Sequence, residues 1–488
     1  MDRITHLVFD VGSTFTKATG FALAGGRFDL LASGQAPTTV ENIETGLAAA
    51  LARLAPHVPD WDAATFASSS AAGGLRMVAL GYMPKVTAKA AKEVAMNAGA
   101  RVLEVLSSED PPPYRTEVLR EIRPDIILLT GGTDGGDASA LEENARAVAG
   151  AAGNGWEPVV IVAGNRDAQA SAETILNATG IRTRRVANIL PTIHELRVRH
   201  AREAIHDQFI RQITRAPGLA KLASRVRGTV IPTPGAVLLG AELLARGTRE
   251  EDGLGGLIVV DVGGATTDVH SVLPELEDLA IEERGLVISN EKQVSFRTVE
   301  GNLGMRISAG GVVEAIGARA VLAYADPAGL AAAFGRPLSG DAAEELAERL
   351  ETYAARLGRE PDFLAPENAL EGQFDTALAT AAVGVALRRH AGSLATEANP
   401  VLGLAPGMPV GRDLRQVTRV IAVGGVFAHS SPERRRGILE RAFANPGLSL
   451  LPASPRFFTD DRYVLYAVGV LGQHLPDPAL RFAKTLFT

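Results

Sequence analysis

The chain has 488 residues and a net charge of −7, with 46% hydrophobic residues, 22% charged residues and no cysteine. At about 100–200 residues per domain, this length allows several domains with buried cores. The absence of cysteine excludes disulfides, thiolate nucleophiles and cysteine-ligated metal clusters. The acidic balance argues against nucleic acid as the main partner. We expect a cytoplasmic protein without a membrane span, because no signal sequence and no apolar run of about 18 residues is visible.

Short β-branched runs alternate with alanine-rich stretches along the chain, which is typical of the α/β class. Strands are predicted at residues 7–11, 126–130, 159–163, 257–262 and 420–423. Helices are predicted at residues 41–54, 88–98, 141–149, 168–177, 193–211, 235–244 and 342–353. Each predicted strand ends in a glycine-bearing loop, which is where open α/β sheets bind ligands.

Pro- and Gly-containing breaks suggest how the chain divides into domains. We expect an N-terminal lobe at residues 1–105, an additional α/β segment at 106–190 and a helical connector at 191–228. A C-terminal lobe is expected at 229–488, with a helical insertion near 328–359.

One motif occurs twice, about half a chain length apart. Residues 7–14 read LVFDVGST, and residues 258–267 read IVVDVGGATT. In both copies an apolar strand ends in an aspartate, Asp10 or Asp261, and runs into a turn of small residues. A single repeat of this length predicts two related lobes rather than a solenoid.

The chemistry of this motif fits a phosphate. Glycine lets backbone N–H groups approach a phosphate, and hydroxyls add donors. The carboxylate suits a phosphate only if a hydrated Mg²⁺ lies between them, so Asp10 and Asp261 are the candidate metal ligands. The candidate phosphate contacts are Gly12, Ser13, Thr14, Gly263, Gly264, Ala265, Thr266 and Thr267. One copy alone could be a plain β-turn, but two copies favour the phosphate interpretation.

Lys17 follows the first motif and is expected on the returning strand of a hairpin. There it would contact the terminal phosphates as a point charge; the alternative is a solvated surface lysine. A further predicted strand ends in the pair Gly424 and Gly425, which would let a flat ring lie against bare backbone. That pair could also belong to an ordinary strand–turn–helix connection.

These motifs together resemble the actin/Hsp70/sugar-kinase superfamily of nucleotide-binding proteins. Residues 10–17 and 261–268 look like its two phosphate loops, 424–425 like its adenosine motif, and 232–237 and 467–469 like its connecting helices. The resemblance implies two ribonuclease-H-like lobes around a nucleotide cleft that holds ATP and Mg²⁺. Asp268 would position or deprotonate the attacking water. Ile231 stands where Hsp70-like members carry an acidic residue, so Glu242 could substitute for it or hydrolysis could be slow.

Longer stretches, at residues 127–136, 232–238, 261–272 and 297–306, resemble the MutL-type accessory proteins of adenosylcobalamin-dependent glutamate mutase. The resemblance implies an ATP-driven reactivating chaperone with weak ATPase activity, which releases damaged cobalamin from a mutase. Its partners would be the mutase subunits, and a homodimer is compatible with the sequence. Other candidate functions are a small-molecule kinase, a hydantoinase/oxoprolinase-like hydrolase, or a nucleotide-binding module without turnover. The glycine-rich loop at 130–137 fits either a ligand contact or a tight turn.

Overall fold

The computed structural model of the chain describes residues 3–12, 15–39, 42–55, 57, 59–70, 76–81, 101–192, 197, 199–213, 222–273, 295–338, 341–398 and 405–488. These residues form two compact units, one ending at Leu239 and the other beginning at Gly240. Each unit contains a five-stranded sheet with one of the repeated motifs.

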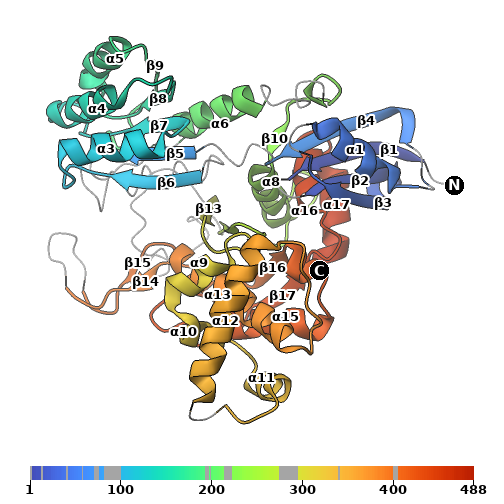
Figure 1. The fold of residues 1–488 in the computed structure, drawn as a ribbon. Coiled ribbons are helices and arrows are strands. Elements are labelled where there is room, and N and C mark those ends of the chain that lie inside the picture. Colours follow the sequence, from blue (N-terminus) through green and yellow to red (C-terminus); the bar gives the residue numbers. More distant parts are fainter. Residues whose placement is uncertain are drawn as a thin grey trace. The chain divides into compact units, whose positions relative to one another are not determined.

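The sheet of the first unit has the order β3-β2-β1-β4-β10 (Figure 1). Its strands are β1 (Ile4–Val11), β2 (Phe15–Ala24), β3 (Arg27–Pro37), β4 (Pro59–Ser69) and β10 (Ile231–Pro232). The first three strands are antiparallel neighbours, whereas β4 and β10 add in parallel beside β1. Helix α1 (Ile43–Ala52) buries Ile43 and Ala50 in the same apolar core as the β1–β3 meander.

A second sheet in this unit is wholly parallel, with the order β6-β5-β7-β8-β9. Its strands are β5 (Arg76–Leu80), β6 (Arg101–Leu106), β7 (Ile126–Leu129), β8 (Val159–Val162) and β9 (Arg182–Arg185). Helices α3 (Pro112–Ile122), α4 (Ser139–Ala151) and α5 (Gln169–Asn177) pack their apolar residues on it. In strand order this is the 2-1-3-4-5 arrangement of doubly wound folds.

This parallel sheet begins earlier than the expected segment at 106–190. Strand β5 pairs in parallel with both β6 and β7, so the run from Arg76 belongs to the same sheet although it precedes residue 106. The N-terminal part of the sequence expected as one lobe therefore carries strands of two sheets. The local sequence pattern marks where a strand lies but does not show which distant strand it pairs with, so the pairing of β5 with β6 and β7 could not be predicted.

The sheet of the second unit repeats the first, with the order β13-β12-β11-β16-β17. Its strands are β11 (Leu257–Val262), β12 (Thr267–Val272), β13 (Ser295–Glu300), β16 (Arg419–Val423) and β17 (Arg456–Thr459). Again three antiparallel strands form a meander, and two strands add in parallel beside the first of them. The two sheets have identical strand order and direction, which confirms the two related lobes predicted from the repeat and the ribonuclease-H-like fold that the resemblance implied.

The core of the second unit is built around α13 (Leu370–His390), which contacts β11, β12 and β13. Most of its residues are buried, and a helix that is apolar on all sides is a core helix. The remaining helices of this unit are α9 (Ala309–Ile316), α10 (Ala318–Leu322), α11 (Pro327–Phe334), α12 (Ala342–Arg359), α14 (Gly425–Ala428), α15 (Pro432–Phe443), α16 (Leu465–Gly472) and α17 (Pro476–Phe487). A short ribbon of β14 (Ser393–Leu394) and β15 (Pro409–Val410) completes it.

Helix α8 (Thr233–Arg246) carries the division between the units, since Leu239 belongs to the first and Gly240 to the second. A Cβ atom at Gly240 would lie 2.6 Å from the carbonyl oxygen of Leu465 and 3.2 Å from the amide nitrogen of Gly469. Helices α8 and α16 therefore approach backbone to backbone. The C-terminal lobe was expected from residue 229, but β10 and the start of α8 belong to the first unit.

All five predicted strands are present as β1, β7, β8, β11 and β16. Predicted helices correspond to α1, α4, α5, α6 (Arg199–Ile213), α8 and α12, and α11 and α12 lie in the region near 328–359. The helix predicted at 88–98 lies outside the described residues. Among the helices that the structure describes, none is long and apolar enough to cross a membrane.

Candidate functional site

The first hairpin brings Asp10 and Lys17 together. They are direct partners across β1 and β2, so both side chains lie on one face, and Lys17 Nζ is 3.5 Å from Asp10 Oδ2. The turn closes through Gly12 N–H, which donates to Phe15 O at 3.0 Å. A Cβ atom at residue 12 would lie 2.6 Å from that oxygen, so the turn requires glycine. The predicted contacts Ser13 and Thr14 lie outside the described residues.

Asp10 is only 2% exposed, and two hydroxyls that the sequence did not single out hold it. Oδ1 accepts hydrogen bonds from Ser68 Oγ at 2.8 Å and from Thr233 Oγ1 at 2.6 Å. Ser68 lies near the end of β4, and Thr233 is the first residue of α8. Thr233 falls in the stretch 232–237, which resembles a connecting helix, but the pattern alone did not connect either residue with Asp10.

The second hairpin has the same register as the first. Asp261 pairs directly with Asp268, and Gly263 N–H donates to Thr266 O at 2.8 Å. Asp261 and Asp10 thus occupy equivalent positions, whereas Asp268 stands where the first hairpin has Lys17. Asp261 is partly exposed, but Asp268 is buried.

Asp268 forms a buried ion pair. Its Oδ1 accepts from Nε of Arg297 at 2.8 Å and from Nη2 at 2.6 Å. Its Oδ2 accepts from Thr266 Oγ1 at 3.3 Å. The guanidinium of Arg297 therefore fixes the orientation of the Asp268 carboxylate. Arg297 lies on β13 within the noted stretch 297–306, but its partner could not be read from the sequence.

A tight segment after β13 supports the turn of the second hairpin. Met305 N–H donates to Gly263 O at 3.0 Å, and Arg306 N–H donates to Gly264 O at 2.9 Å. Thr267 Oγ1 donates to Leu303 O at 2.5 Å. The carbonyl oxygens of Gly263 and Gly264 therefore accept hydrogen bonds from the segment that follows β13. In the first hairpin Thr38 has a similar role, since its Oγ1 donates to Gly12 O at 2.8 Å.

Arg306 is itself held by a buried carboxylate on α13. Its Nη1 and Nη2 each lie 3.2 Å from an oxygen of Asp375. Burial raises the pKa of Asp375, and the guanidinium of Arg306 opposes that shift. The bidentate pair links the core helix to the segment beneath Gly264, so the shape of the turn depends on the packing of α13.

Gly424 and Gly425 connect β16 to α14. Gly424 has φ +118°, and a Cβ atom there would overlap the backbone of Val262, 2.9 Å from its carbonyl carbon. The strand end at 423–424 therefore packs directly against the end of β11. Only glycine allows this approach.

The glycine-rich loop at 130–137 is closed by its own hydrogen bonds. Asp134 Oδ1 accepts from Asn188 Nδ2 and from the backbone N–H of Arg166, each at 2.9 Å. Gly135 N–H donates to Asp167 Oδ2 at 2.9 Å, and Asn165 Nδ2 donates to Gly136 O at 3.1 Å. Since these carboxylates fasten neighbouring loops, the bonds favour the tight-turn interpretation.

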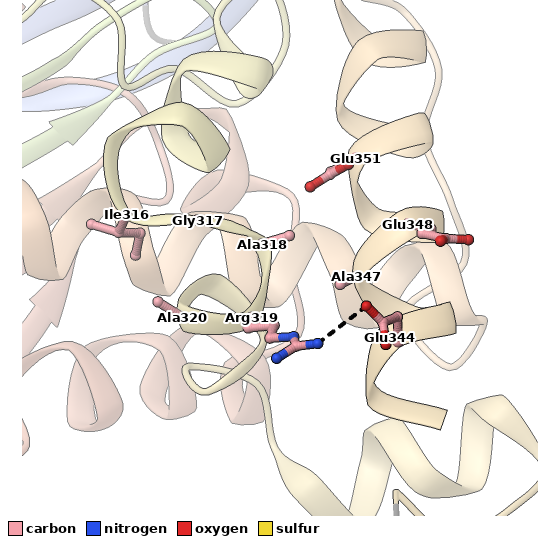
Figure 2. Close-up of a pocket in the computed structure, with 9 residues that line it drawn as sticks. All are labelled: Ile316, Gly317, Ala318, Arg319, Ala320, Glu344, Ala347, Glu348 and Glu351. Atoms are coloured by element: carbon pink, nitrogen blue, oxygen red, sulfur yellow. Dashed lines mark hydrogen bonds and ion pairs between the residues drawn. The ribbon is translucent and has the colours of Figure 1, made fainter. Parts of the chain in front are cut away.

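Figure 2 shows a pocket in the second unit between α10 and the start of α12. Arg319 and Glu344 form an ion pair of 3.3 Å at one side, and Glu348 and Glu351 follow along α12. None of the predicted site residues lines this pocket. An exposed acidic wall alone defines no ligand, so the pocket is not assigned a role.

Solved structures show only weak similarity to the chain. An activator of the 2-hydroxyisocaproyl-CoA dehydratase from Clostridium difficile, with bound ADPNP, has a TM-score of 0.29 and 11% identity, covering 99% of this chain and 98% of that chain. A xylulose kinase from Bifidobacterium adolescentis has a TM-score of 0.30 and 14% identity, covering 97% and 93%. Scores this low carry no argument, and the fold assignment rests on the order and direction of the strands.

Sequence similarity is much stronger. The sequence profile of the MutL protein family matches residues 6–487. Protein MutL of Clostridium tetanomorphum is 37% identical to this chain over 487 residues, which cover 98% of each of the two proteins. A match of this extent leaves no segment of more than a few residues unaccounted for. The chain therefore belongs to the MutL protein family, as its motifs predicted.

Proposed function

We propose that this protein is an ATP-dependent accessory factor of an adenosylcobalamin-dependent mutase of the glutamate mutase type. ATP binding and hydrolysis would release damaged cobalamin from the mutase, so that intact coenzyme can bind. Membership of the MutL family supports the association with a mutase. The proposed site of action is cytoplasmic, and neither nucleic acid nor a membrane takes part.

The observation that carries the nucleotide part of the proposal is the equivalence of the two hairpins. In both, a carboxylate ends a buried strand and the following turn closes through a glycine N–H onto the carbonyl three residues later. Backbone N–H groups and small residues in such turns suit a phosphate. We propose that the triphosphate of ATP contacts the turn at 263–267 and Lys17.

The side chains of this site also fit Mg²⁺. The donors are carboxylate oxygens, which Mg²⁺ prefers, and this ion keeps several waters when it binds between carboxylates and phosphates. Ser68 and Thr233 already occupy Oδ1 of Asp10, so a hydrated ion fits better than direct contact with that oxygen. Asp10 and Asp261 would hold the ion through its waters, and the bound ion would neutralise phosphate charge.

Asp268 would position the attacking water, because its ion pair with Arg297 fixes the carboxylate. Ile231, which stands in place of an acidic residue, pairs with Ser68 in the sheet next to Asp10. An isoleucine cannot orient or activate water, so we expect slow turnover in the absence of the partner. Partner-dependent stimulation would then couple hydrolysis to release of cobalamin.

The test is ATP hydrolysis by the full chain, with and without a mutase loaded with inactivated cobalamin. The expected result is slow hydrolysis that the loaded mutase stimulates. The Asp261→Ala variant should lose turnover while keeping its fold, and Asp362→Ala, a change at an exposed carboxylate of the same unit, should behave as wild type. Near-wild-type hydrolysis by Asp261→Ala would contradict the site assignment.

Other outcomes identify the alternative functions. Stimulation by a small metabolite instead of the mutase would indicate a kinase or a hydantoinase/oxoprolinase-like hydrolase. Nucleotide that stays bound without any turnover, even with the mutase present, would indicate a binding module.

A further inference from the structure

Tyr463, in the turn between β17 and α16, has an unusual backbone conformation. Its φ is +54°, in the left-handed region. Of the non-glycine residues with positive φ in the described part of the chain, it is the one aromatic residue; the others are Arg123, Asn154 and Asn445. A bulky residue rarely adopts this conformation, and such strain is concentrated at functional sites.

The surrounding turn holds Tyr463 in place. The side chain of Asp460, 2% exposed, accepts hydrogen bonds from Val464 N–H at 2.9 Å and from Leu465 N–H at 2.8 Å. Asp460 N–H donates to Ala422 O at 2.8 Å, which fastens the turn to β16. The conformation of Tyr463 is thus set by the first turn of α16 and by the neighbouring strand.

The ring of Tyr463 reaches the adenosine motif predicted from the sequence. Its hydroxyl oxygen lies 3.3 Å from the position that a Cβ atom would take at Gly425. Gly425 has no positive φ. A larger residue at this position would therefore crowd the Tyr463 hydroxyl without straining the backbone. Gly425 and the hydroxyl end of Tyr463, both half-buried, therefore lie side by side at the end of β16.

The strand order puts Gly425 and Tyr463 where the sugar and base of a nucleotide would lie if its phosphates bind at the turn after β11. Strands β11, β16 and β17 are parallel neighbours in that order, so their carboxyl ends lie along one edge of the sheet. The phosphate turn follows β11, Gly424 follows β16, and Tyr463 follows β17. With about 4.8 Å between neighbouring strands, β17 lies roughly 10 Å from β11. A nucleotide whose phosphates rest on the β11 turn would extend its sugar and base along this edge.

We propose that Tyr463 is a base-binding residue, whose ring packs against the purine of the bound nucleotide beside Gly424 and Gly425. This inference rests on the proposed nucleotide function and deepens it. Arg435 would hold the end of α14 and the turn of Tyr463 together. Its Nη2 donates to Ala428 O at the end of α14, and its Nη1 lies 3.5 Å from Asp461 in the same turn as Tyr463.

The test compares ATP with inorganic tripolyphosphate, which has the three phosphates without sugar or base. Both would be titrated calorimetrically, with Mg²⁺, into the full chain and its variants. In Tyr463→Gly we expect the Kd for ATP to rise roughly 10- to 100-fold, the range for loss of one base–aromatic stack, and the Kd for tripolyphosphate to stay unchanged. Glycine accepts φ +54° without strain, so this variant removes the ring without adding backbone strain.

Two further variants sharpen the test. Tyr463→Phe keeps the ring and should bind ATP within about threefold of wild type. Tyr114→Ala, at an exposed tyrosine of α3, is the control and should bind as wild type.

Unchanged ATP affinity in Tyr463→Gly, or an equal loss for ATP and tripolyphosphate, would overturn the inference. If Asp261→Ala loses ATP while Tyr463→Gly keeps it, only the role of Tyr463 is refuted. If the wild-type chain binds neither ligand, the proposed function itself fails.

Discussion

Replacement of Gly424 by alanine should destabilise the second unit strongly, because this position combines two separate demands. The backbone has φ +118°, where an L-residue is strained by about 1–3 kcal/mol. The added Cβ would also overlap the backbone of Val262, and relieving that overlap costs about 1–3 kcal/mol more. We expect a loss of about 2–6 kcal/mol, a large share of the 5–15 kcal/mol by which a domain is typically stable.

Two other glycines of the same unit separate these demands. Gly335, at the C-cap of α11, has φ +80° but open space around it, so Gly335→Ala should cost only about 1–2 kcal/mol of conformational strain. Gly425→Ala meets only the end of the Tyr463 side chain and should change stability by less than about 1 kcal/mol.

Hydrogen exchange in increasing urea, followed on peptides from β11 and β16, measures these differences. Both tryptophans of the chain, Trp61 and Trp156, precede residue 240. Their fluorescence therefore reports the first unit and should not change in any of the three variants. If Gly424→Ala lowers the unfolding free energy no more than Gly335→Ala does, the close contact with Val262 adds no penalty and the reasoning is refuted.

Two further predictions concern buried charge in the second unit. Arg297→Met should destabilise this unit by about 3–5 kcal/mol because it leaves Asp268 buried without its arginine partner. Adding Asp268→Leu should recover most of that loss. A double variant no more stable than the single variant in urea unfolding would argue against this explanation. Burial, together with Arg412 for His390 and Arg297 for His270, holds the pKa of both imidazoles well below the usual value, so the unfolded chain binds more protons than the folded one below pH 6.5. Unfolding free energy should therefore fall by up to about 1.4 kcal/mol per pH unit per histidine as the pH drops below 6.5, and His390→Gln should show a shallower slope than wild type in the same unfolding experiment.

The site residues differ in how far the sequence could predict them. The pairing of Asp10 with Lys17 follows from a short hairpin, because a tight turn sets the register locally. The contacts of Ser68 and Thr233 with Asp10 could not be predicted, since they depend on β4 and α8 meeting the end of β1. The same holds for Arg297, whose partner Asp268 lies on the neighbouring strand.

Element prediction failed where periodicity is absent. Helix α13 was not predicted, because a helix buried on all sides has no polar face to mark its period. Strand β5 was too short to be recognised as the start of the parallel sheet, and β2, with its small residues, lacks a clear alternation.

By itself the sequence determined the family, the duplication of the phosphate motif and the position of each motif at a strand end. These features are local, since a strand, a glycine turn and an acidic residue are read from a few consecutive residues. Only the tertiary structure decided that the parallel sheet begins at Arg76, that Arg297 holds Asp268 and that Tyr463 reaches Gly425. Each of these depends on strand order and packing between distant segments, which no local pattern encodes.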